Sequence, residues 1–259
     1  MAGKFSPSTK YCDEVADCKL KIIIIKFKMQ IIKLKKSIIP SCDFDSLEKL
    51  NKLVKATCSV KRIGAYKIGF ELVIPFGLEK VVKTIRNITR LPIIYDHQKA
   101  GTDIPEMGEK FMKACKFVDA VILFPQAGPE TEVAWIKAAQ KVSMNIIIGG
   151  EMTHQAFLKE AGGFIDNDAP KRIYEIAASM GVADFVIPGN KPEKSMEYVN
   201  LIKNKGKNPV FYSPGLIAQG GKISELAEKL DSWHAIIGRA IYEAKDMKKA
   251  AEEMVKELV

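Results

Sequence analysis

The chain has 259 residues, of which 47% are hydrophobic and 27% are charged, and its formal net charge at pH 7 is +9. This composition is ordinary for a soluble globular protein, and the length suits one large α/β domain or two small ones. The positive charge indicates anionic partners such as a phosphorylated metabolite, whereas the spread of lysines among glutamates argues against a nucleic-acid groove.

The N-terminal segment carries no recognisable targeting or membrane signal. Its longest apolar run, Ile22–Ile25, is flanked by lysines and is too short for the core of a signal peptide or for a membrane span of ~20 residues. The five cysteines form no Cys-x-x-C pair, which indicates reduced thiols in a cytoplasmic protein. We therefore expect an N-terminal extension over residues 1–36, a catalytic domain over residues 37–259, and no membrane partner.

From residue 37 onward, short apolar runs alternate with amphipathic stretches. The runs predict eight strands, at Ser37–Cys42, Ala65–Phe70, Pro92–Tyr95, Ala120–Phe124, Asn145–Ile148, Asp184–Ile187, Pro209–Tyr212 and Ala235–Ile237. The stretches between them predict helices at Leu47–Ala56, Gly77–Ile88, Glu106–Cys115, Glu130–Val142, Lys171–Met180, Glu193–Lys203, Ile223–Leu230 and Arg239–Val259. Eight such units predict a single-domain (β/α)8 TIM barrel. A doubly wound open sheet would need a Gly-rich first turn, which is absent.

Charged residues gather where the first three strands end, at the rim that carries the chemistry of such barrels. Lys67 lies inside the second run, and its side chain points into the barrel if its neighbours face the helices. Asp43 ends the first run, and Asp96, Lys99 and Asp103 follow the third. We predict that Asp96, Lys99 and Asp103 meet Lys67 in the barrel mouth, although a purely structural ion-pair network is the alternative.

Such an array suits chemistry on an anion. Alternating acids and bases keep lysines protonated and aspartates ionised in a low-dielectric pocket. The carboxylates can repel a substrate anion while an ammonium stabilises or protonates a carbanion. Because Lys99 lies among the acids, we expect no metal there.

The turns after the seventh and eighth runs predict a phosphate site, which barrels often build between these two loops. In the segment Ser213–Gly221, Gly220 lets the backbone approach an anion and Gln219 offers a neutral donor. Gly238-Arg239 follows the eighth run, and Arg239 adds a charge-assisted fork. The alternative is an ordinary turn and a surface charge.

In order and spacing, these segments resemble the orotidine 5'-phosphate decarboxylase family, in particular its compact archaeal type. The resemblance runs from about Ile38 to the C-terminus and rests on Cys42-Asp43, Tyr66-Lys67-Ile68-Gly69, Asp96…Lys99…Asp103-Ile104-Pro105-Glu106, Glu151-Met152-Thr153-His154, Pro188-Gly189-Asn190-Lys191-Pro192-Glu193, Ser213–Gly221 and Gly238-Arg239. It implies a homodimeric TIM barrel that converts orotidine 5'-phosphate to UMP and CO2 without a metal or organic cofactor.

The resemblance also implies roles for individual residues. Lys99 would donate the proton to C6 of the pyrimidine, with Asp96 beside the departing carboxylate. Lys67 would link the array to the ribose, and Asp103 would reach the partner subunit's site. The implied ligand contacts are Asp43 with the ribose, Thr153 with the pyrimidine edge, Gln219, Gly220, Gly238 and Arg239 with the phosphate, and Pro188 at the start of the segment that closes over the ligand.

The central motif departs from the family's usual Asp-x-Lys-x-x-Asp, because one additional residue lies on each side of Lys99. Strict strand alternation would place Asp96 and Lys99 on opposite faces, whereas a β-bulge or an early end of the strand brings them together. Two other functions remain open: a Mg²⁺-dependent sugar-phosphate decarboxylase or aldolase of the same family, similar to hexulose-phosphate synthase, and a non-catalytic nucleotide-binding paralogue.

Overall fold

The chain folds into a closed barrel of eight parallel strands that pair in chain order, with β1 also paired to β8. The computed structural model describes residues 30–97 and 101–258. The strands are β1 (Lys36–Cys42), β2 (Tyr66–Gly69), β3 (Ile93–Asp96), β4 (Ala120–Leu123), β5 (Asn145–Gly149), β6 (Asp184–Val186), β7 (Val210–Ser213) and β8 (Trp233–Ile237). All eight predicted strands are present, and the TIM-barrel prediction is confirmed.

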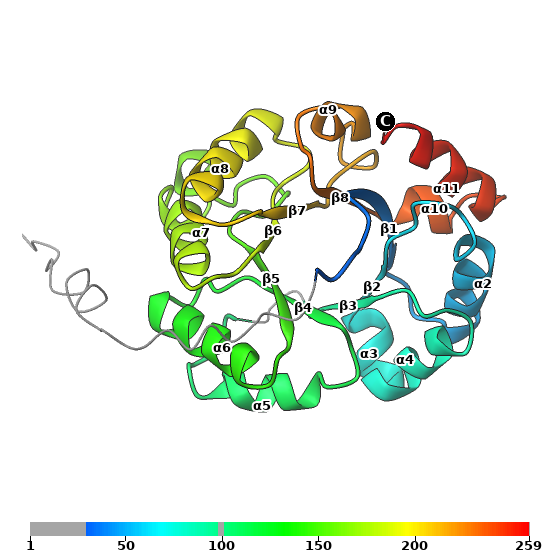
Figure 1. The fold of residues 1–259 in the computed structure, drawn as a ribbon, viewed down its shortest axis with the longest axis horizontal. Helices are drawn as coiled ribbons and strands as arrows, with labels where there is room; N and C mark the ends of the chain where they lie inside the picture. The colour runs from blue at the N-terminus through cyan, green and yellow to red at the C-terminus, as the bar shows by residue number, and fades with distance from the viewer. Residues whose placement is uncertain (1–29, 98–100, 259) are drawn as a thin grey trace, which may run out of the picture.

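The helices form a ring outside the strands (Figure 1). They are α2 (Leu47–Thr57), α3 (Phe70–Phe76), α4 (Leu78–Arg86), α5 (Met107–Ala114), α6 (Pro129–Lys141), α7 (Ala169–Ser179), α8 (Pro192–Lys205), α9 (Ile223–Ala227), α10 (Arg239–Tyr242) and α11 (Met247–Lys256), with a short 3-10 helix, η1, at Lys159–Ala161. In the described part of the chain, no helix is long and apolar enough to cross a membrane.

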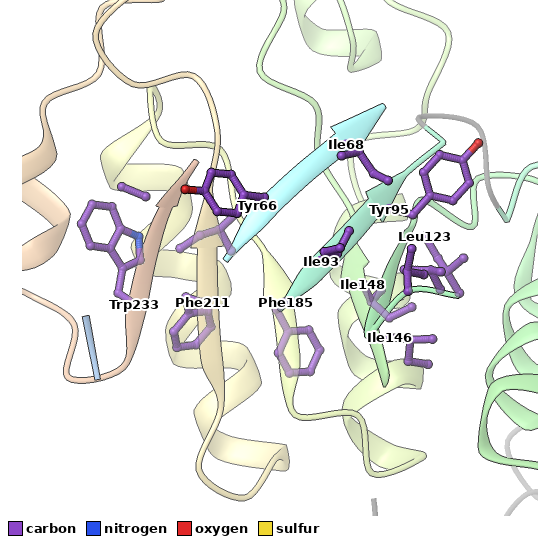
Figure 2. Close-up of a cluster of buried hydrophobic side chains, with 14 of the residues drawn as sticks. Tyr66, Ile68, Ile93, Tyr95, Leu123, Ile146, Ile148, Phe185, Phe211 and Trp233 are labelled. Carbon is purple, nitrogen blue, oxygen red and sulfur yellow. The ribbon is translucent and has the colours of Figure 1, made fainter. Parts of the chain in front are cut away.

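Strand alternation divides the buried side chains into an outer and an inner cluster. The outer cluster lies between strands and helices and includes Tyr66 and Ile68 of β2; Figure 2 shows part of it. The inner cluster fills the barrel and includes Ile94 and Ile122. Because successive side chains of a strand point to opposite faces, Lys67, between Tyr66 and Ile68, points into the barrel as predicted.

The inner cluster extends to the residues just before β1. Ile31 and Ile32 are buried and belong to the same cluster as Ile39, although they fall in the segment expected to be an extension. Gly64 lies beside this segment, and a Cβ there would approach Ile32 to 2.9 Å. Residues 1–29 lie outside the described residues, so the extension stays a prediction for that stretch.

The helices differ from the prediction at two places. The strand predicted over Ala65–Phe70 ends at Gly69, and Phe70 begins α3, a helix that was not predicted because its apolar sequence lacks amphipathic periodicity; Gly77, at φ +77°, separates it from α4. The single helix expected over Arg239–Val259 is divided into α10 and α11. Asp246 begins the second of these helices as its N-cap, because its side chain accepts a hydrogen bond from the backbone N–H of Lys249.

Candidate active site

A buried lysine lies between two carboxylates at the C-terminal end of the barrel. The Nζ atom of Lys67 is 3.1 Å from Asp43 Oδ1 and 3.1 Å from Asp96 Oδ2. Only 5% of the Lys67 side chain is exposed, against 14% for Asp96 and 37% for Asp43. Asp43 is available for this contact because Ser46 caps α2 instead, accepting from the backbone N–H of Lys49. Of the array predicted around Lys67, the structure shows Asp96 in contact with it, and Asp43 is a second partner.

The environment of Lys67 keeps it charged. Burial disfavours the ammonium, but the negative charges of Asp96 and Asp43 and their hydrogen bonds outweigh burial and raise the pKa of Lys67 above its ordinary value. Ser41 donates a further hydrogen bond of 2.6 Å to Asp43 Oδ2. The site therefore offers a fixed cation with a carboxylate on each side.

This charged group forms one wall of a cavity of about 340 Å³, within the usual range for small-molecule sites. Apolar side chains of the lining include Ile122, Phe124 and Val186. The remaining lining residues are Ser41, Glu71, Glu151, Met152, Thr153, Pro214, Gly215, Leu216, Ala218, Gln219, Ile236, Gly238, Arg239 and Tyr242. A ligand here would contact both charged groups and hydrocarbon.

The loop after β7 and the turn after β8 close the cavity at the end away from β3. Gln219, Gly238 and Arg239 line it, as predicted. Gly220 is exposed, has φ +90° and is absent from the lining, so the structure does not place it against the cavity. Exposed Ile217 has φ +61°, a conformation that is strained for a β-branched residue. The loop after β7 thus has an unusual backbone conformation at the cavity that Arg239 also lines.

The segment after β5 is tied down by side chains from the segment after β6. Glu151 is 3% exposed, and its Oε1 accepts a hydrogen bond of 2.6 Å from Lys191 Nζ. Lys191 also donates to the carbonyl of Met152 at 3.0 Å, and the Tyr198 hydroxyl donates to Glu151 Oε2. Thr153, the predicted pyrimidine contact, lines the cavity directly after these fixed residues.

The sequence points to Glu151 only through the Glu151-Met152-Thr153-His154 run and does not predict its partners. Its contact with Lys191 joins residues 40 positions apart, and only the fold brings them together. Within residues 30–97 and 101–258, no group of three or more His, Cys, Asp or Glu side chains is placed to hold a metal ion. The Glu-Met-Thr-His run was the one available signal for Glu151.

The strand that precedes the lengthened motif, β3, ends at Asp96. Lys99 lies outside the described residues, so the arrangement that brings it to Asp96 stays a prediction. Asp103 does not line the cavity of its own chain: it is exposed, and its Oδ1 accepts from the backbone N–H of Ile104 at 2.7 Å. Within one chain, the structure does not bring Asp103 to Lys67.

Side chains of β3 and α6 hold both ends of the segment that carries the lengthened motif. At its start, the Tyr95 hydroxyl is 2.5 Å from His97 Nδ1. At its far end, Thr131 Oγ1 donates to the carbonyl of Asp103 at 2.9 Å, and Trp135 Nε1 donates to the carbonyl of Ile104 at 3.1 Å. Hydrogen bonds therefore hold the described residues on both sides of positions 98–100.

Pro188, predicted to begin a closing segment, is buried and does not line the cavity. Its carbonyl accepts a hydrogen bond of 2.7 Å from Ser195 Oγ, within the first turns of α8. The next residue, Gly189, donates its backbone N–H to the carbonyl of Pro214 at 2.8 Å. Pro188 thus lies behind the cavity wall, at the contact between the loops after β6 and β7.

Comparison with known proteins gives one consistent result. Residues 36–254 match the model of the orotidine 5'-phosphate decarboxylase / HUMPS family. The orotidine 5'-phosphate decarboxylase of Methanocaldococcus jannaschii is 32% identical over 193 residues, covering 74% of this chain and 84% of the relative. That of Methanosarcina mazei is 32% identical over 201 residues, covering 76% and 84%.

Solved structures agree with the sequence comparison. The crystal structure of the M. jannaschii orotidine 5'-monophosphate decarboxylase with the inhibitor BMP superposes with a TM-score of 0.75 at 27% identity, covering 86% of this chain and 98% of the other. The orotidine 5'-phosphate decarboxylase of Pyrococcus horikoshii gives 0.69 at 26% identity, covering 85% and 98%. With its closed barrel and with a family match that spans β1 to most of α11, the chain belongs to the orotidine 5'-phosphate decarboxylase / HUMPS family.

Proposed function

We propose that this protein decarboxylates orotidine 5'-phosphate to UMP and CO2, a step of pyrimidine biosynthesis. The observation that carries the proposal is buried Lys67, held between Asp43 and Asp96 on the wall of a nucleotide-sized cavity. The names of the relatives support the same reaction. The net charge of +9 would favour the approach of an anionic substrate.

The proposed chemistry depends on electrostatics and needs no metal or organic cofactor. Loss of CO2 leaves a carbanion at C6 that the pyrimidine ring delocalises poorly. Lys99 stabilises this charge as an ammonium and then donates a proton to C6. Asp96 lies beside the departing carboxylate, and Lys67 holds Asp96 in place while linking it to the ribose side of the site.

Binding energy remote from C6 would orient the substrate. We assign the ribose hydroxyls to Asp43 and the pyrimidine edge to Thr153. Phosphate binding then supplies the energy for loop closure and for exclusion of water. The proposed phosphate contacts are Gln219, Arg239 and the backbone near Gly220 and Gly238, with Pro188 at the base of the closing segment.

We further infer that the protein is a cytoplasmic homodimer in which Asp103 completes the partner's site. In support, Asp103 is exposed and lies outside the cavity of its own chain. The neighbouring Ile104 is 58% exposed, and burial of such a side chain against a second copy would be favourable. This dimer is symmetric, so each chain contributes the same segment to the other.

Turnover of orotidine 5'-phosphate by the pure protein, followed as loss of ultraviolet absorbance, tests the proposed function. We expect conversion to UMP at an unchanged rate when a chelator is present. Loss of turnover with the chelator, or activity on a hexulose 6-phosphate only with Mg²⁺, would instead identify a metal-dependent member of the family. UMP binding without turnover of either substrate would identify a non-catalytic paralogue.

A further inference from the structure

Three loops of the cavity converge on one glycine. A Cβ on Gly215 would lie 2.8 Å from Thr153 Cγ2, 3.1 Å from Gln219 Oε1 and 3.2 Å from Asn190 Oδ1. These side chains come from the loops after β5, β7 and β6, respectively. Gly215 also has φ +83°, so both its conformation and its surroundings favour glycine. The proposed pyrimidine and phosphate contacts, Thr153 and Gln219, thus lie next to the same point.

Only one of the two polar atoms in the Asn190 side chain has a hydrogen-bond partner at this point. Its Nδ2 donates a hydrogen bond of 3.0 Å to the carbonyl of Thr153. Its Oδ1 is buried and has no hydrogen-bond partner among the residues that the structure describes. A buried acceptor without a donor costs about 1–3 kcal/mol, so a state that supplies a donor is favoured. The side-chain amide of Gln219 can supply this donor after rotating about its last side-chain bond: its Oε1 lies against the same point of Gly215, and the rotation brings Nε2 there instead.

The backbone beside Asn190 is fixed while the loop that bears Gln219 is exposed. Lys191 is held by Glu151 and by the carbonyl of Met152. Gln219 and its neighbours belong to an exposed stretch, 217–220. Asn190 is therefore a stationary group against which the loop after β7 can close.

We propose that Asn190 is a positioning residue that joins the two halves of the site. Its Oδ1 accepts a hydrogen bond from Gln219 Nε2 when a phosphate-bearing ligand is bound, while its Nδ2 holds the carbonyl of Thr153. Phosphate binding at one end of the cavity then stiffens the pyrimidine contact at the other. This inference rests on the proposed function.

A double-mutant cycle tests this coupling. Dissociation constants of UMP and of uridine are measured by calorimetry for wild type, Asn190→Ala, Gln219→Ala and the double variant. We expect each single variant to weaken UMP binding about tenfold, with uridine changed much less, and the double variant to be little worse than either single one. Losses that multiply in the double variant, or equal losses for UMP and uridine, would overturn the coupling.

Asn145→Ala is the matched control, because Asn145 Nδ2 also donates to a backbone carbonyl, that of Asp119, at the opposite end of β5. Asn145→Ala should lower thermal stability, and its effect on UMP binding should be the same with and without Gln219→Ala. If Asn190→Ala does not fold, the nearly isosteric Asn190→Leu replaces it; leucine fills the same space without a donor or an acceptor, and the same unequal weakening of UMP and uridine binding is expected. Absence of orotidine 5'-phosphate turnover by wild type would overturn the proposed function and this inference together, whereas turnover without coupling overturns the inference alone.

Discussion

At the scale of single residues, the site depends on one cation that two carboxylates share. The carboxylates of Asp43 and Asp96 are not fully exposed to water, and the ammonium of Lys67 stabilises their charges in place of solvent. Removal of one member of such a group leaves uncompensated charge, which costs about 3–5 kcal/mol when the group is well buried. We therefore expect Lys67 to be important for stability and, in the proposed function, for the reaction.

Lys67→Met should lower the free energy of unfolding by about 3 kcal/mol and reduce turnover at least about a hundredfold. The physical reason is that two carboxylates would face each other without the ammonium between them. Urea denaturation and a turnover assay at pH 7 measure the two effects. Lys52→Met is the matched control, because exposed Lys52 pairs with Glu48 on the surface of α2 and should change stability by less than about 0.5 kcal/mol. Equal effects of Lys67→Met and Lys52→Met would contradict the assignment of Lys67 to a buried charged group of the site.

A buried carboxyl group outside the site predicts that the stability of the fold depends on pH. Glu132 of α6 is 1% exposed, both of its carboxylate oxygens lack a partner among the described residues, and burial raises its pKa to about 9. Since the unfolded pKa is about 4.5, the folded chain binds one more proton between these values. Glu132 therefore lowers stability progressively as the pH rises from about 5 to 9.

Glu132→Gln does not titrate, so its advantage over wild type should grow from near zero at pH 5 to a few kcal/mol at pH 9. Urea denaturation at pH 5, 7 and 9 measures this difference. Glu109→Gln is the control, since exposed Glu109 pairs with Lys141 and should change stability little at any of these pH values. A difference for Glu132→Gln that is constant with pH would show that Glu132 has a partner in solution.

At the scale of elements, α6 fixes the end of the segment that follows β3. Thr131 and Trp135 both donate to carbonyls of this segment, at Asp103 and Ile104. A lengthened motif needs such anchors, because two additional residues give the backbone more conformations. We infer that α6 offsets the additional length by fixing where the segment ends.

Thr131→Val keeps the shape of the side chain but removes the hydrogen bond to Asp103. It should cost about 1 kcal/mol of stability and reduce kcat severalfold, because the catalytic segment becomes less well positioned. Thr57→Val is matched to it, since buried Thr57 also donates to a backbone carbonyl, that of Leu53 on α2, and neither Thr57 nor its other partner, the Tyr66 hydroxyl, lines the cavity. Thr57→Val should lose stability with kcat unchanged. A loss of kcat in both variants would mean that kcat falls with stability in general and not because the segment after β3 is less well positioned.

The sequence predicted elements well where a periodic signal existed. Alternation in β2 placed Lys67 inside the barrel from its neighbours alone. α3 was missed because Phe70–Phe76 is nearly all apolar and contains Pro75, so it has no helical periodicity. The contact of Lys191 with Glu151 had no sequence signal, since only the closed barrel brings the loops after β5 and β6 together.

At the scale of the whole molecule, one chain gives an incomplete version of the predicted array. Asp43, Lys67 and Asp96 meet, whereas Asp103 is exposed and does not line the cavity of its own chain. No property of a single sequence distinguishes a side chain that serves its own site from one that serves a symmetric neighbour. The proposed homodimer accounts for the position of Asp103.

Mixing two inactive variants tests this dimer. Lys99→Ala and Asp103→Ala should each remove turnover, but mixed subunits should recover about a quarter of the wild-type rate, since half of the dimers are mixed and one site in each is intact. The assay follows turnover after subunit exchange, with each variant incubated alone as the control. No recovery, with exchange shown by mass spectrometry, would place Asp103 in the site of its own chain.

The proposed function requires the lengthened segment after Asp96 to bring the Lys99 ammonium into the cavity beside Lys67. Parallel assays of orotidine 5'-phosphate turnover and UMP binding, for wild type and Lys99→Ala, test this requirement. We predict turnover by wild type, and for Lys99→Ala loss of turnover with UMP binding largely retained. Full activity of Lys99→Ala would contradict this requirement.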